Sequence, residues 1–199
     1  AASERKVALW QHLRTLAGLD AATPHIPAPM IQIFGGGRHA GNRIDVQDYL
    51  VIATGATSFV EATEWIAEIY IAAAKSMQQA GKLNGVADEG GVWPDFRANE
   101  DGLELLVKAI ESAGLRPGRD IGIALDIAAS SFYVDGRYRL ALEGKNLDTS
   151  GMIDMLERWV ASYPIVSLED PLAEDDDEGF VEITRRLGSS VQIVGDDYL

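Results

Sequence analysis

Apolar residues recur at spacings of three and four in several segments of the chain, a pattern that predicts amphipathic helices. The most regular helix starts at Ser58, where Ser58 and Glu61 fit a capping box, and ends before Gly81, a typical helix stop. Further helices are predicted at residues 6–18, 100–113, 152–163 and 179–187. The helical periodicity therefore covers a large part of the chain.

Short continuous apolar runs between these helices predict strands at residues 30–34, 46–53, 121–125, 165–168 and 191–194. Residues 132–140 predict a hairpin that turns on Asp135-Gly136. From Ile121 onward strands alternate with helices, and the strands are apolar on both sides, which indicates a parallel sheet covered by helices. Three prolines within residues 21–30 indicate a linker. We therefore expect a helix and linker over residues 1–26 and an α/β domain over residues 27–199.

An acidic residue stands at or just past the end of three of these strands: Asp126, Glu169 and Asp196. In a barrel of alternating strands and helices such strand ends meet on one face, where active sites lie. Three carboxylates there would suit a hard cation such as Mg²⁺. A single acid after a strand, such as Asp170 or Asp197, more often caps the next helix. Three acids at equivalent positions after three strands favour the metal site.

Composition narrows the classes of partner. The chain has 17 basic and 31 acidic side chains, a net charge of -14, which argues against nucleic acid or an anionic membrane as the partner. It has no cysteine, which excludes disulfides, zinc–thiolate sites and thiol nucleophiles. No apolar run is long enough to span a bilayer, and the opening residues lack the apolar core of a signal peptide. A cytoplasmic protein is expected.

Five stretches occur in an order that resembles the enolase family: PAPMIQIFGGGRHAGNRIDVQDYLV, VADEGGVWP, LDIAASSFYVDGRY, YPIVSLEDPLAEDD and VGDDYL. The resemblance covers essentially the whole chain. It implies the first part of a TIM-type (β/α) barrel of the enolase kind, with five of its strands. It also implies magnesium-dependent, reversible dehydration of 2-phosphoglycerate to phosphoenolpyruvate in glycolysis, and a homo-oligomer, a dimer or higher.

The resemblance assigns roles to four acids. Asp126, Glu169 and Asp196 match the ligands of the magnesium ion, and Glu169 and Asp196 also border the substrate. Glu89, in DEGG, matches the acid that helps to expel the substrate hydroxyl, a task for which a carboxyl must be held protonated. Without the family, DEGG would be interpreted as a polar turn.

His39, in RHAGN, matches the histidine that approaches the substrate, and Gln47 and Asp48 fall where the family has a Gln-Glu pair facing the substrate. Without the family, His39 would be a hydrogen-bonded loop residue, and the pair would be outward polar positions of a strand. Asp48 is one methylene shorter than the family's glutamate. Gly35 and Arg38 also depart from the family's loop, and Arg38 brings a cation close to the cleft.

The family's catalytic base, a lysine on a later strand, has no counterpart here. The five lysines of the sequence all lie away from predicted strand ends: Lys6, Lys75, Lys82, Lys108 and Lys145. The leading interpretation is a fragment of an enolase, whose open sheet would leave apolar faces and an edge uncovered. Two alternatives stay open: a related enzyme acting on another carboxylate, and a non-catalytic enolase-like protein used for binding or assembly.

Overall fold

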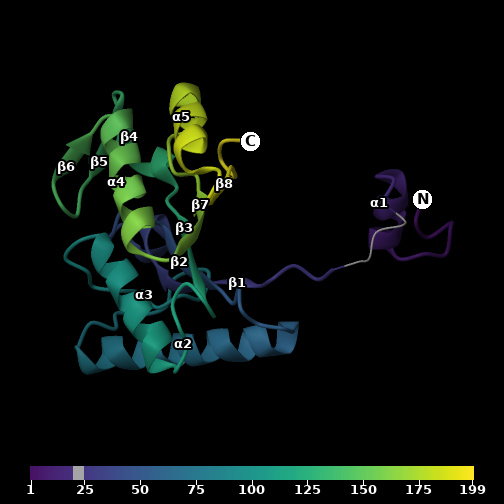
Figure 1. The fold of residues 1–199 in the computed structure, drawn as a ribbon. Helices are drawn as coiled ribbons and strands as arrows, with labels where there is room; N and C mark the ends of the chain where they lie inside the picture. Colours follow the sequence, from purple (N-terminus) through teal and green to yellow (C-terminus); the bar gives the residue numbers. More distant parts are fainter. Residues whose placement is uncertain (20–24) are drawn as a thin grey trace.

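The computed structural model describes residues 1–19 and 25–199 (Figure 1). Its α-helices are α1 (Leu9–Leu16), α2 (Phe59–Gln79), α3 (Glu100–Ser112), α4 (Thr149–Ser162) and α5 (Asp177–Leu187). Two 3-10 helices, η1 (Gly37–Ala40) and η2 (Ala129–Phe132), follow strand ends. The strands are β1 (Met30–Gly35), β2 (Asp48–Ile52), β3 (Gly122–Asp126), β4 (Tyr133–Val134), β5 (Arg137–Leu140), β6 (Lys145–Leu147), β7 (Ile165–Glu169) and β8 (Gln192–Val194). Within the described ranges, no helix combines the length and the apolarity needed to cross a bilayer.

Five strands form the main sheet in the order β1-β2-β3-β7-β8. β3, β7 and β8 are parallel, as the sequence predicts from Ile121 onward, whereas β1–β2 and β2–β3 are antiparallel. α2 and α3 together connect β2 to β3, and the chain returns to the end of the sheet that it left, because Ile52 at the end of β2 pairs with Gly122 at the start of β3. As a result the start of β2 lies beside the carboxyl ends of β1 and β3.

The helices form where the apolar spacing predicts them, and the apolar faces of α2, α3, α4 and α5 pack on the sheet. In α2 the Ser58 hydroxyl accepts the N–H of Glu61 at 3.1 Å, as an N-cap. The Glu61 carboxylate accepts the N–H of Thr57, not that of Ser58, so the second half of the box is shifted by one residue. The apolar residues of α2 at spacings of three and four begin with Phe59, which is 49% exposed. The rest of that face is buried: Ala62, Ile66, Ile69, Ala73 and Met77.

The predicted hairpin is present, and a third strand joins it. Asp135 and Gly136, between β4 and β5, have φ angles of 53° and 74°, as a tight two-residue hairpin turn requires. β6 then pairs with β5 to complete a separate three-stranded sheet. The sequence analysis missed β6 because Lys145–Leu147 is short, polar and without alternation.

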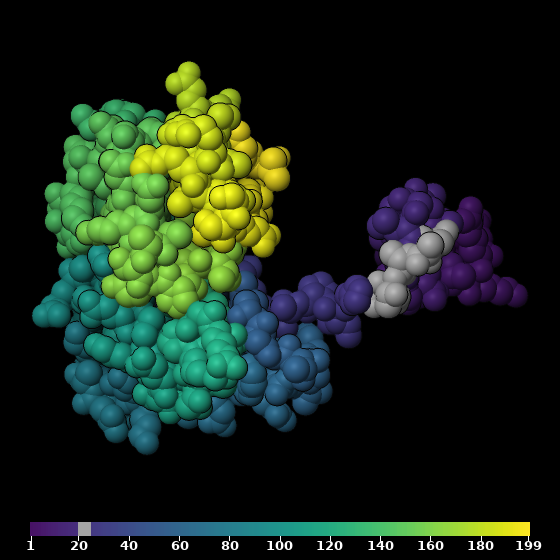
Figure 2. Space-filling view, viewed as in Figure 1, coloured from purple at the N-terminus to yellow at the C-terminus, as the bar shows by residue number. Residues whose placement is uncertain are grey.

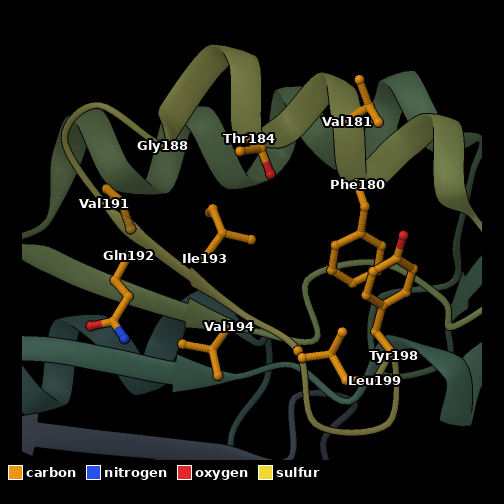
Figure 3. Close-up of a pocket in the computed structure, with 11 residues that line it drawn as sticks. Phe180, Val181, Thr184, Gly188, Val191, Gln192, Ile193, Val194, Tyr198 and Leu199 are labelled. Atoms are coloured by element: carbon orange, nitrogen blue, oxygen red, sulfur yellow. The ribbon is translucent and has the colours of Figure 1, made fainter. Parts of the chain in front are cut away.

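The main sheet is not closed: β1 and β8 are its end strands. An apolar groove runs along the β8 edge beneath α5, with Phe180 and Tyr198 stacked at 3.8 Å between ring centroids (Figure 3). Val181, on the α5 side of the groove, is 71% exposed. The predicted site residues do not line this groove. It is an uncovered apolar edge of the kind expected for an open part of a barrel.

Residues 1–19, which include α1, lie away from the rest of the molecule (Figures 1 and 2). The apolar side of α1 is accordingly exposed, with Leu9 at 64%, Leu13 at 54% and Leu16 at 67%. The first part of the predicted linker, 21–24, falls outside the described residues. The division at residues 26 and 27 stays a prediction.

Candidate active site and metal centre

The strand register brings four carboxylates to one end of the main sheet. Asp48, the first residue of β2, is paired with Asp126, the last residue of β3. Asp126 is paired in turn with Glu169, the last residue of β7. Glu169 is paired with Val194 of β8, and Asp196 follows two residues later. We call Asp48, Asp126, Glu169 and Asp196 the acidic row.

His39 and Glu89 lie at the Asp48 end of this row. His39 is in η1, directly after β1, and its Nδ1 is 3.9 Å from Asp48 Oδ1 and 3.7 Å from Glu89 Oε1. The loop that carries Glu89 is attached to β1 because the Val92 N–H donates to the Ile33 carbonyl at 2.8 Å. The Asp48 side chain is buried, whereas that of Glu89 is 51% exposed. The segments that carry His39 and Glu89 therefore meet around Asp48.

Gln32 connects these segments, and the sequence analysis did not single it out. Its side chain is buried and its Nε2 donates to Asp48 Oδ1. Its Oε1 accepts the N–H of Gly91 at 2.6 Å. A Cβ on residue 91 would lie only 2.5 Å from that oxygen, so this close approach requires glycine. The available signal was a glutamine inside the otherwise apolar run MIQIF.

Burial changes the protonation of Asp48. Desolvation raises the pKa of Asp48 from 3.8 to about 6, the hydrogen bond from Gln32 lowers it, and the nearby Glu89 carboxylate raises it. The sequence analysis expected a carboxyl held protonated at Glu89. In the structure the buried carboxyl of this group is Asp48, whose pKa the nearby Glu89 carboxylate raises further.

Substitution Asp48→Asn should reduce the loss of folding stability that occurs as pH rises. The folded-state pKa of about 6 exceeds the ordinary 3.8, so the folded protein binds the proton more tightly and loses stability as pH rises from about 4 to 6. The introduced asparagine can still accept from Gln32 but does not titrate. In urea unfolding with chelator present, we expect the variant to gain on the order of 1–3 kcal/mol relative to the parent between pH 4 and pH 8. Parallel loss of stability in both proteins would contradict this.

Asp126 and Glu169 form the middle of the acidic row. The Asp126 oxygens accept the Gln47 side-chain amide at 2.9 Å and the Ala128 N–H at 3.0 Å. Burial raises the pKa of Asp126 to about 7, with further increases from Glu169 and Asp48. Burial also raises the pKa of Glu169, with contributions from Asp170 and Asp196. These partly buried carboxylates repel one another, and they offer only oxygen atoms as metal ligands. Both features suit a hard divalent cation.

Two groups of three side chains bring ligand atoms within 4.8 Å of one another in the described part of the chain: His39 with Asp48 and Glu89, and Asp170 with Asp196 and Asp197. The predicted ligand set, Asp126 with Glu169 and Asp196, is not one of these compact groups. It shares Asp196 with the second group, and Asp126 and Glu169 lie between the two groups along the sheet. A shared ion at Asp126, Glu169 and Asp196 stays a prediction.

Asp170 does not cap a helix, although an acid at this position would ordinarily be expected to do so. The N-cap of α5 is Asp176, whose carboxylate accepts the Gly179 N–H at 3.1 Å. The Asp170 carboxylate instead accepts the backbone N–H groups of Asp196 and Asp197. Asp170 thus belongs to the structure of the site, a role that the sequence analysis missed.

Comparison with known proteins agrees with this geometry. Residues 23–199 match the family described as enolase, C-terminal TIM barrel domain. The chain is 49% identical over 195 residues to Enolase 1 of Desulfitobacterium hafniense (strain Y51), an alignment that covers 96% of this chain and 44% of that protein. The chain therefore spans less than half the length of this curated relative. The open α/β sheet is a partial barrel, and the chain belongs to the enolase family, within its C-terminal TIM barrel domain.

Proposed function

We propose that this chain forms the magnesium-binding and acid-bearing part of an enolase active site, which interconverts 2-phosphoglycerate and phosphoenolpyruvate. The observation that supports this best is the acidic row, since three of its carboxylates end adjacent parallel strands and the fourth lies beside His39 and Glu89. Membership of the enolase family supports this choice of reaction. The row would supply the metal-binding carboxylates that the reaction needs, at one end of the sheet.

Asp126, Glu169 and Asp196 would hold the magnesium ion. Bound Mg²⁺ would supply electrostatic stabilisation of the negative charge that develops on the substrate carboxylate. The Gln47 amide, which donates to Asp126 at 2.9 Å, keeps one of these carboxylates oriented. The three acids come from neighbouring strands of one sheet, so their main chains are held in a fixed register.

Glu89 would donate the proton that accompanies departure of the substrate hydroxyl. Its side chain is half exposed. The buried Asp48, with its pKa raised to about 6 by burial and by the nearby Glu89 carboxylate, can hold a proton next to it. His39, within 4 Å of both carboxylates, would face the substrate and offset their negative charge when protonated.

A second candidate is a non-catalytic enolase-like protein used for binding. No lysine lies at this end of the sheet within the part of the chain that the structure describes, and absence of a base lysine from the full-length protein as well would support this candidate. Lys75 lies on α2, Lys108 on α3 and Lys145 in β6, whereas Lys6 lies in a turn and Lys82 in the loop after α2. Action on another carboxylate is the third candidate, which Asp48 and Arg38 leave open. Both rivals retain the metal site.

Calorimetric titration of the chelator-treated chain with Mg²⁺ tests the metal site common to these functions. We expect saturable binding and a rise in melting temperature, because a ligand at 100 times its Kd stabilises the folded state by about 2.7 kcal/mol. Na⁺ at equal ionic strength is the control. Absence of Mg²⁺ binding at pH 8, above the raised pKa values of Asp48 and Asp126, would refute the proposed site.

A further inference from the structure

Asp170 stands at the point where three of the site's loops meet. It directly follows Glu169 at the end of β7, and only 3% of it is exposed. Its φ angle is 37°, in the left-handed region, which costs a residue with a side chain about 1–3 kcal/mol and occurs mainly where surrounding contacts enforce it. The contacts that hold Asp170 in this conformation are made with the segments at the ends of the neighbouring strands.

The carboxylate of Asp170 holds the segment after β8. Its Oδ1 accepts the N–H of Asp196 at 3.0 Å, and its Oδ2 accepts the N–H of Asp197 at 2.8 Å. Each carboxylate oxygen therefore accepts a hydrogen bond from one of two successive backbone N–H groups. Hydrogen bonds with an ionised acceptor are roughly twice as strong as neutral ones. This pair fixes the backbone from which the Asp196 side chain projects.

The backbone of Asp170 makes hydrogen bonds to β8 and to the loop after β3. Its N–H donates to the Val194 carbonyl at 3.0 Å, and its own carbonyl accepts the N–H of Ala129 at 3.1 Å. The loop after β3 begins at Asp126 and turns at Ala128, whose φ of 46° is also left-handed. One residue thus links the three chain segments that carry Asp126, Glu169 and Asp196.

We propose that Asp170 is a positioning residue that sets the relative placement of the three magnesium ligands. This inference rests on the proposed metal site. The role requires an ionised acceptor with two oxygens, because an asparagine presents one oxygen and one NH₂ group, and the NH₂ would face a backbone N–H. An aspartate also tolerates the left-handed backbone better than most residues with a side chain. Asp170 does not itself need to touch the ion.

The test compares Asp170→Asn with Asp120→Asn. Asp120 also accepts a backbone N–H, that of Arg116 at 2.9 Å, and pairs with the Arg116 guanidinium at 2.8 Å. It precedes β3, whereas Asp126 ends that strand, about 20 Å away at 3.3 Å per residue. Both substitutions remove one negative charge and one charge-assisted network, but only one of them is at the proposed site.

Two quantities would be measured well below both melting temperatures: the Mg²⁺ dissociation constant by calorimetry, and amide hydrogen exchange at residues 196 and 197 by NMR. We expect Asp170→Asn to weaken Mg²⁺ binding by about 10–100-fold, as loss of groups that orient metal ligands typically does, and to speed exchange at both amides. Asp120→Asn should change neither. If Asp170→Asn does not fold, Asp170→Ser, which is smaller and keeps one acceptor, is expected to weaken binding to the same degree.

The outcomes separate the inference from the function on which it rests. A parent chain that binds no Mg²⁺ would overturn the metal site, and the inference with it. A parent that binds Mg²⁺, with a folded Asp170 variant of equal affinity, would overturn the inference alone. That result would hold even if the variant melted at a lower temperature, because a purely structural residue changes stability without changing affinity in the folded protein.

Discussion

The 199-residue chain should form phosphoenolpyruvate from 2-phosphoglycerate at least about 10²–10⁴-fold more slowly than the longer Enolase 1 of D. hafniense, assayed in parallel. The reaction removes a proton next to a carboxylate, and a positioned base typically contributes that factor. No lysine lies at the carboxyl ends of the main sheet in the described chain. The open sheet also lacks the further walls that would hold the substrate in a reactive position.

The measurement is the ultraviolet absorbance of phosphoenolpyruvate, with protein of confirmed mass and with or without chelator. Rapid, chelator-sensitive turnover by the 199-residue chain would show that another group acts as the base. A longer chain that adds a lysine on a later barrel strand should be active and magnesium-dependent. If that longer chain stays inactive, the binding-protein alternative gains support.

Substitution Glu169→Gln should weaken Mg²⁺ binding by at least about 100-fold, more than the loss of an orienting group. Glu169 ends the central of the three parallel strands, so its carboxylate lies between those of Asp126 and Asp196. Glutamine has the same shape but one charge less. The pKa of Glu169 is raised by burial and neighbouring acids, so its ionisation destabilises the metal-free protein. The variant should therefore be at least as stable as the parent at pH 8 in chelator.

The matched control is Glu182→Gln on α5, where Glu182 pairs with Arg185 at 2.7 Å on the exposed face of the helix. This variant should bind Mg²⁺ with unchanged affinity. Calorimetry gives the affinities, and urea unfolding gives the stabilities. Equal affinity of Glu169→Gln and the parent would remove Glu169 from the site. Weaker binding together with a large loss of stability would indicate a general structural defect.

The sequence determined the local structure to a large extent. The helices and main strands lie where the apolar spacing places them, because burial of an apolar face on a helix or strand leaves a periodic trace. Three acids of the proposed site were also singled out in this way, because carboxylates directly after apolar runs are visible without knowledge of the fold. Short polar β6 left no such trace.

Only the tertiary structure decided how these parts combine. The antiparallel direction of β2, which places Asp48 beside Asp126, depends on how α2 and α3 pack together, and no local pattern encodes it. The same is true of Gln32 with Gly91, which are 59 residues apart, and of Asp170 with Asp196, which are 26 apart. Each of these contacts joins a polar side chain to a backbone group in a distant segment. Backbone donors are present at almost every position, so a local sequence pattern does not indicate which of them a side chain contacts. The sequence determined which residues carry the chemistry. The packing of the sheet decided which backbone groups hold them in place.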